Sequence, residues 1–229
     1  MKTVFELSLR RLLTHRILLI TMIVFPVLIT FVANMDGLES VAYAYSLFGI
    51  ILLFTSFMMA KQLIEDRQSK TIIRIAASPI NHKDYLLGHL GAYLLIMSLQ
   101  VTLFFLLMLL RTSMDLPFYI WAYILMIVFS IMSICFSLFW FSLFKRFTTA
   151  VAVYSVVANL MAIIGGMSFP LALMPDNIRQ IAIVFPTYWY AFGLEEASHG
   201  TSSTIIISLL ILLGFAIIFL TIGSKRRFE

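Results

Sequence analysis

Histidine and acidic side chains are the first candidates for catalysis or metal binding, and the chain has four histidines, at positions 15, 82, 89 and 199. Their spacing matches no metal motif such as HExxH, in which two histidines one helical turn apart share a face. The sequence also contains no GxxxxGK[ST] phosphate-binding loop. We therefore expect no catalytic residue, no metal site and no directly bound cofactor in this chain.

Ion pairing with another protein is a second kind of chemistry, and residues 61–84 could support it. This stretch reads KQLIEDRQSKTIIRIAASPINHKD and is the longest polar run between hydrophobic blocks. Its centre, Thr71–Ala77, is helical in character and carries isoleucines beside Arg74. Ser78 and Pro79 end that segment, because the residue before a proline is disfavoured in the α region. The stretch could dock a soluble partner, or it could be a basic loop that only fixes orientation in a membrane.

Six hydrophobic blocks surround this stretch and must position it. The chain has 229 residues, of which 62% are hydrophobic and 12% charged, whereas a soluble domain has about 25% charged residues. A membrane span needs about 20 apolar residues, so six spans leave room for short connections within one domain, residues 1–229. We predict an all-α integral membrane protein with six transmembrane helices, at about 17–33, 40–60, 85–110, 119–144, 148–169 and 203–222.

The distribution of lysine and arginine orients these spans. Six crossings place both termini on one side, which then holds fourteen of the sixteen basic residues, Arg111 and Arg179 being the exceptions. Basic residues concentrate in cytoplasmic loops, so both termini are predicted to be cytoplasmic. The basic residues flank spans, where they meet anionic lipid headgroups; we expect membrane lipid and not nucleic acid as their partner.

Two further segments have amphipathic patterns. Residues 1–16 place Phe5, Leu9, Leu12 and Leu13 on one helical face, which predicts an interfacial helix; a plain basic anchor is the alternative. Between spans five and six, the pattern predicts short extracellular helices. The aromatic run 188–190 that follows is expected in the headgroup layer.

The spans themselves are almost free of ionisable residues. His89 is the main exception, and Gln100 and Asn159 are the principal amides. Ion-coupled carriers need charged relays or broken-helix ion sites inside the membrane. If the protein moves a substrate uphill, its energy must come from outside the membrane part.

The polar stretch carries a recognisable pattern at Glu65, Arg67, Thr71, Arg74, Ser78, Pro79 and Gly88. These residues resemble E-x-[ER]-x-x-G-T-x-x-R-x-x-x-[ST]-P-[IV], followed by a leucine-rich run ending in glycine, of type-2 ATP-binding-cassette (ABC-2) exporter permeases. Lys70 stands where that pattern has glycine, which is a departure in the local turn. Residues 165–194, GGMSFPLALMPDNIRQIAIVFPTYWYAFGL, are similar to the same family's segment between helices five and six.

The resemblance implies a permease subunit of an ATP-driven exporter in a prokaryotic cytoplasmic membrane. It implies a second permease, identical or different, and two copies of a separate ATPase that binds the ATP and magnesium. A cytoplasmic coupling helix at about 70–78 would dock on the ATPase. The implied coupling residues are Glu65, Arg67, Lys70, Thr71, Arg74, Ser78 and Pro79.

In such permeases the second and fifth helices face the partner permease. That implies a substrate pathway or dimer interface at Tyr45, Phe48, Phe54, Phe57, Met58, Asn159, Met161 and Met167. Methionine-rich surfaces adapt to varied shapes, which favours hydrophobic or amphiphilic cargo such as a drug, an antimicrobial peptide or a lipid-like molecule. Helix packing and lipid contact explain the same residues. A haem- or cofactor-export permease and a non-transporting immunity or sensor protein remain as alternatives.

Overall fold

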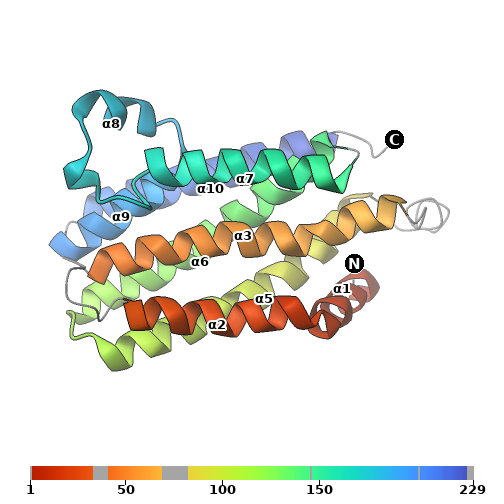
Figure 1. The fold of residues 1–229 in the computed structure, drawn as a ribbon, viewed down its shortest axis with the longest axis horizontal. Coiled ribbons are helices and arrows are strands. Elements are labelled where there is room, and N and C mark those ends of the chain that lie inside the picture. Colours follow the sequence, from red (N-terminus) through yellow and green to blue (C-terminus); the bar gives the residue numbers. More distant parts are fainter. Residues whose placement is uncertain (1, 33–40, 69–81, 145, 201, 226–229) are drawn as a thin grey trace.

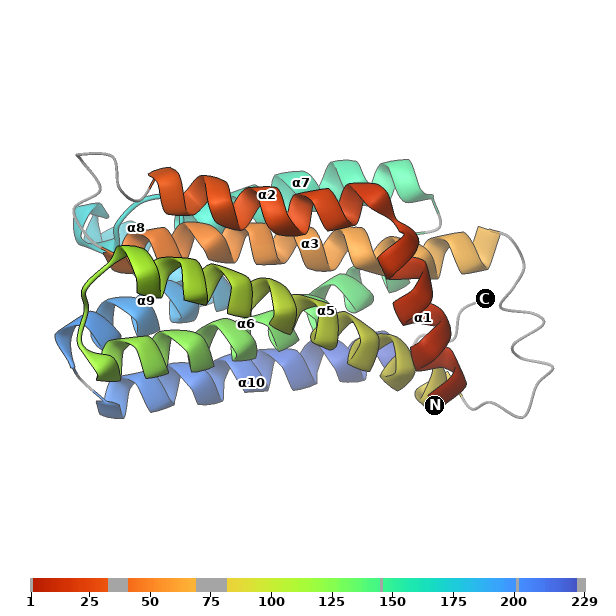
Figure 2. The ribbon, with the colours of Figure 1, turned by 90° about the horizontal axis from the view of Figure 1, so that it is seen from below.

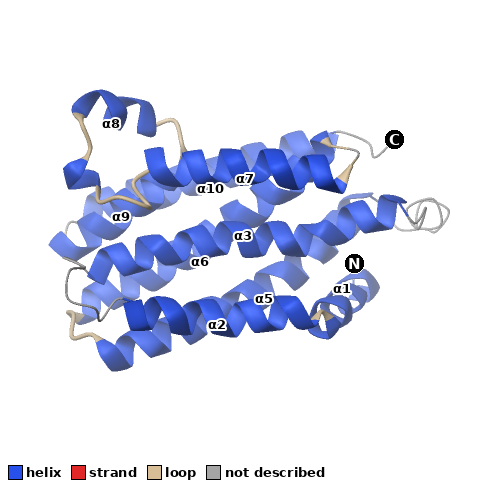
Figure 3. Ribbon diagram, in the orientation of Figure 1, coloured by secondary structure: helices blue, strands red, loops and turns tan. Residues whose placement is uncertain are grey.

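The computed structural model describes residues 2–32, 41–68, 82–144, 146–200 and 202–225, and within them every regular element is a helix (Figure 3). The predicted coupling helix at 70–78 lies outside these residues. The α-helices are α1 Lys2–Thr14, α2 Arg16–Val32, α3 Val41–Gln68, α5 His82–Arg111, α6 Leu116–Leu143, α7 Phe147–Ile164, α8 Asp176–Ala182, α9 Pro186–His199 and α10 Ser202–Lys225; a 3₁₀ turn, η1, covers Leu171–Leu173.

Five of these helices, α3, α5, α6, α7 and α10, are long and apolar enough to cross a membrane. The count rises to six if α1 and α2 are taken together as one broken span, and these two helices are bent by 72° at their junction. The helical membrane class is therefore confirmed. The amino-terminal helix is a separate element, since the chain turns sharply between Thr14 and Arg16.

The long helices run side by side along one axis, as Figures 1 and 2 show from perpendicular directions. The end of the molecule that holds α1 also holds the end of α3, the start of α5 and the end of α10, while α8 and α9 lie at the other end. Of the five long helices, α3 and α6 are the most enclosed and α10 and α7 the least. Helix α6 is apolar all round, which is what a helix surrounded by others requires.

Hydroxyl groups tie three of the helices together in the interior. Ser56 of α3 lies 2.9 Å from Ser137 of α6, Oγ to Oγ. Tyr154 of α7 donates to the Leu53 carbonyl of α3 at 2.8 Å. Polar groups in a hydrocarbon environment must find internal partners, and these groups find theirs across helix contacts.

Helix α9 packs into the bundle instead of lying on its outer surface. The Tyr190 hydroxyl donates to the Tyr45 carbonyl of α3 at 2.9 Å, and its ring stacks on Phe129 of α6 with centroids 4.2 Å apart. Tyr188 is buried as well, whereas Trp189 is half-buried. The sequence had suggested the headgroup layer for all three aromatic residues; the structure instead packs Tyr188 and Tyr190 against the protein, because helix formation turns them inward.

Gly49 permits this close approach of α9 to α3, so we expect Gly49→Ala to destabilise the protein. An added Cβ would collide with the Met167 methyl group and the Tyr190 ring, both fully buried. Such overpacking costs about 1–3 kcal/mol, and thermal denaturation in detergent should show a lower midpoint. Gly214→Ala in α10 is the matched control, since its Cβ would meet no atom within 4 Å. Equal midpoints for the two variants would contradict this account.

Candidate functional site

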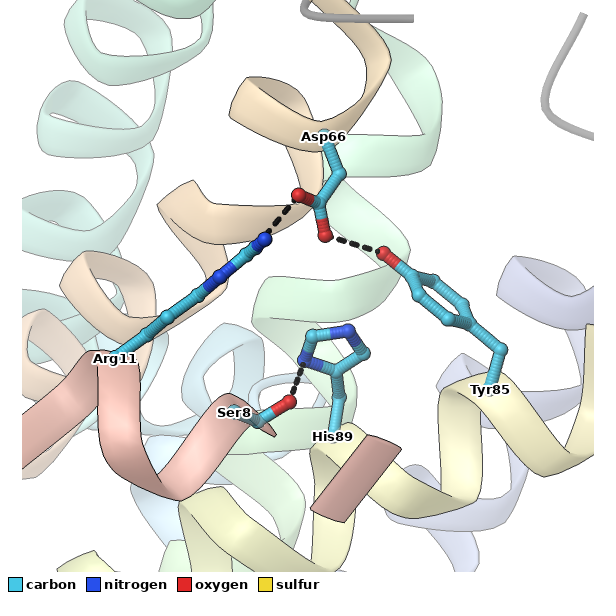
Figure 4. Close-up of polar contacts among 5 residues, drawn as sticks. All are labelled: Ser8, Arg11, Asp66, Tyr85 and His89. Atoms are coloured by element: carbon cyan, nitrogen blue, oxygen red, sulfur yellow. Dashed lines mark hydrogen bonds and ion pairs between the residues drawn. The ribbon is translucent and has the colours of Figure 1, made fainter. Parts of the chain in front are cut away.

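The most concentrated group of polar contacts lies where α1, α3 and α5 meet, on both flanks of residues 69–81. Helix α3 ends at Gln68 and α5 begins at His82, so the contacts lie immediately beside the predicted coupling segment. Figure 4 shows five side chains from the three helices converging there. We call this group, Ser8, Arg11, Asp66, Tyr85 and His89, the polar junction.

Asp66 is the centre of the polar junction. Its Oδ1 accepts a hydrogen bond from Nη1 of Arg11 on α1 at 2.6 Å, and its Oδ2 accepts one from the Tyr85 hydroxyl on α5 at 2.9 Å. One carboxylate thus joins three helices through its two oxygens (Figure 4). The Asp66 side chain is 5% exposed and that of Arg11 is 41% exposed, so the acid is buried while the base reaches solvent.

A second contact lies beneath the first. His89 Nδ1 and Ser8 Oγ are 2.9 Å apart, and both residues are fully buried. The imidazole also meets the Tyr85 ring edge to face, with centroids 4.5 Å apart. Helix α1 is therefore fastened to α5 at Ser8 and to α3 at Arg11, three residues apart on neighbouring positions of one helical face.

Burial makes these contacts interdependent. A hydrogen bond to a charged group contributes about 1.5–3 kcal/mol, and a buried charge that loses its partner is strongly destabilising. Asp66 is nearly inaccessible and needs both Arg11 and Tyr85. The arrangement can transmit force, because displacing one of the three helix ends breaks bonds to the other two.

The predicted coupling residues are only partly described by the structure. Glu65 is exposed, and its Oε1 pairs with Nζ of Lys61 at 3.1 Å. The backbone of Arg67 belongs to α3. The side chain of Arg67, and all of Lys70, Thr71, Arg74, Ser78 and Pro79, lie outside the described residues.

The proposed pathway residues fall into two groups. Tyr45, Phe48 and Phe57 are buried among helices of the same chain; Phe48 stacks on Phe104, and Phe57 stacks on Tyr154. Met161 and Met167 are buried too, and Phe54 is half-buried. Met58 and Asn159 are exposed on the outside of the chain. Within one chain, these eight residues therefore form no continuous surface.

Sequence reasoning missed Arg11, Asp66 and Tyr85 as site residues. The available signal was an aspartate directly after Glu65 in a helix that is otherwise apolar on its inward face. No local pattern pairs that aspartate with an arginine 55 positions away. Within the described parts of the chain, no three histidine, cysteine or acidic side chains gather closely enough to hold a metal ion.

A bundle of long apolar helices, with its charged groups collected at one end, defines a multi-pass helical membrane protein. The sequence profile described as "ABC-2 family transporter protein" matches residues 33–225, and the chain belongs to this family. The resemblance found in the sequence is thereby confirmed. The family consists of membrane permease subunits and not of catalytic domains.

Among curated proteins, the chain is similar to one named "Putative transport permease YvfS" from Bacillus subtilis strain 168. The two are 31% identical over 85 residues. The match covers 37% of this chain and 34% of that relative, so the chain spans about a third of the relative's length. Together with the family match, this similarity supports a transport permease.

We expect Asp66→Asn to loosen the polar junction. The amide keeps the shape of the side chain but loses the charge that Arg11 and Tyr85 bind, which should cost about 1–3 kcal/mol. A lower midpoint of thermal denaturation in detergent would report the loss. Glu6→Gln on α1, an acid-to-amide change at an exposed position, should stay within about 0.5 kcal/mol of wild type. An Asp66→Asn midpoint equal to that of Glu6→Gln would contradict the assigned role.

Proposed function

We propose that this chain is the membrane-spanning permease subunit of an ATP-driven exporter, and that residues 65–79 couple it to a separate ATPase. ABC-2 permeases normally work with an ATPase subunit. The observation that carries the coupling proposal is the polar junction, which joins α1, α3 and α5 on the flanks of the predicted coupling segment. Cargo is proposed to be hydrophobic or amphiphilic and to leave the cytoplasm or the inner leaflet.

The physical argument concerns how force enters the membrane part. A push on residues 69–81 reaches α3 and α5 through the chain itself. Arg11 and Ser8 then pass it to α1, since both bind residues on the flanking helices. Rigid elements that move together are what convert a local change into a shift of packed helices. The polar junction therefore supports a role in which nucleotide-driven motion of an ATPase moves three helix ends as one unit.

The coupling proposal is tested by ATPase turnover with the P-loop ATPase that co-purifies with the chain. Charge reversal at an interfacial contact commonly costs about 1.4 kcal/mol or more, so Arg74→Glu should weaken the complex about tenfold and lower stimulated turnover at matched subunit amounts. Replacing Thr71–Ala77 by a flexible linker should act in the same direction.

Arg179→Glu is the matched control, because it makes the same charge reversal on α8 at the opposite end of the molecule. It should leave complex formation and turnover unchanged. Normal binding and turnover in Arg74→Glu and in the loop replacement would overturn coupling through this segment.

We also propose that a second permease copy covers α7. Asn159 lies on the outward face of α7, and among the described residues its amide makes one hydrogen bond, from Nδ2 to the Ser155 carbonyl at 2.8 Å. An amide facing lipid is unfavourable, whereas amides between transmembrane helices act as interhelical contacts. Its exposed apolar neighbours on that face are Val153, Val156, Leu160 and Ile163.

Asn159→Leu should therefore weaken self-association of the permease by about 0.5–2 kcal/mol. Fluorescence energy transfer between two labelled pools in liposomes, measured as lipid is added to dilute the protein, gives the dissociation constant. Ser98→Ala on α5 is the control, since its hydroxyl also bonds within its own helix, to the Leu95 carbonyl. Unchanged or tighter association in Asn159→Leu would count against an interface on α7.

A further inference from the structure

Three buried polar atoms on the facing sides of α3 and α5 have no hydrogen-bond partner in the described protein: Gln62 Oε1, His89 Nε2 and Tyr93 Oη. His89 and Tyr93 are 0% exposed and Gln62 is 8% exposed. Nearly all buried polar atoms in folded proteins are hydrogen-bonded, either to protein or to ordered water. Three exceptions on two neighbouring helices indicate a shared cause.

The pairing of α3 with α5 places these atoms together. Asp66 binds Tyr85 at one end of the contact, and Gln100 Nε2 lies 3.5 Å from Thr55 Oγ1 toward the other end. The two helices thus run antiparallel in a defined register. Gln62, one turn from Asp66 in the direction of Thr55, faces the part of α5 that holds His89 and Tyr93, whose ring centroids are 5.5 Å apart.

The hydrogen-bonding chemistry of the three atoms is complementary to one small ligand. Gln62 Oε1 is an acceptor, and the Tyr93 hydroxyl can donate. His89 Nε2 is an acceptor when the ring proton lies on Nδ1, which faces Ser8 Oγ. A water molecule donates two hydrogen bonds and accepts others, and buried waters typically make about three. A metal cation fits poorly, because the Arg11 guanidinium lies in the same junction.

We propose that a structural water molecule binds between α3 and α5, donating to Gln62 Oε1 and His89 Nε2 and accepting from the Tyr93 hydroxyl. The water extends the polar junction by one helical turn along the α3–α5 contact. Through His89 it is connected to Ser8 and so to α1. This site does not depend on the proposed function, since it concerns the packing of three helices within one chain.

X-ray radiolytic footprinting in ¹⁸O-labelled water tests the site on the full-length protein in lipid nanodiscs. A bound water generates hydroxyl radicals in place, so it oxidises the side chains that it touches even where bulk solvent is excluded. Tyr154 and Tyr190 are internal controls, because both are fully buried and donate to the backbone carbonyls of Leu53 and Tyr45. Tyr93 should be oxidised several-fold faster than either control. Oxidation of Tyr93 as slow as that of the controls would overturn the proposal.

A variant tests whether the atoms share the same water. Tyr93→Phe removes one of the three contacts, so ¹⁸O incorporation at His89 should fall severalfold. Tyr154→Phe, a matched loss of a buried hydroxyl on α7, should leave His89 labelling unchanged. His89 labelling that persists in Tyr93→Phe would contradict a shared site, and the wild-type comparison stands even if that variant is unstable.

Discussion

The buried carboxylate of Asp66 is the constraint on which the end of the bundle depends. It lies at the last turns of α3, where the helix leaves the apolar interior, and it requires compensation for its charge. Arg11 supplies the charge and Tyr85 supplies a second donor. Satisfying one acid therefore fixes the position of an amino-terminal helix and of the helix that follows the coupling segment.

This requirement accounts for the sharp turn between α1 and α2. An amphipathic helix in an interface can lie in many directions, since lipid contacts on its apolar face are not specific. Here α1 carries Arg11 and Ser8 on the side that meets α3 and α5, and both bind defined partners. The 72° bend gives α1 the direction in which those two contacts form together.

The interior of the bundle has a different character from its two ends. Between them, helices are held by apolar packing and by hydroxyls that bond across helix contacts, as at Ser56, Ser137 and Tyr154. At the end opposite the polar junction, α9 returns into the bundle and closes against α3 through Gly49, Tyr190 and Met167. An element gripped at both ends of α3 suits a permease in which that helix must respond to events on one side and shape a pathway toward the other.

The sequence alone determined the membrane class, the approximate helices and the family, because these follow from local hydrophobicity and from a contiguous motif. Hydrophobic length identified α3, α5, α6, α7 and α10, and the residues around Glu65 and Arg74 carried the resemblance that the family match over 33–225 confirmed. Only the tertiary structure decided that Asp66 meets Arg11, that Tyr190 turns inward onto Phe129, and that Phe48 and Phe57 are enclosed within one chain. Those outcomes depend on which helices become neighbours and in what register, and periodicity along one helix contains no information about the partner that its polar or aromatic face will meet.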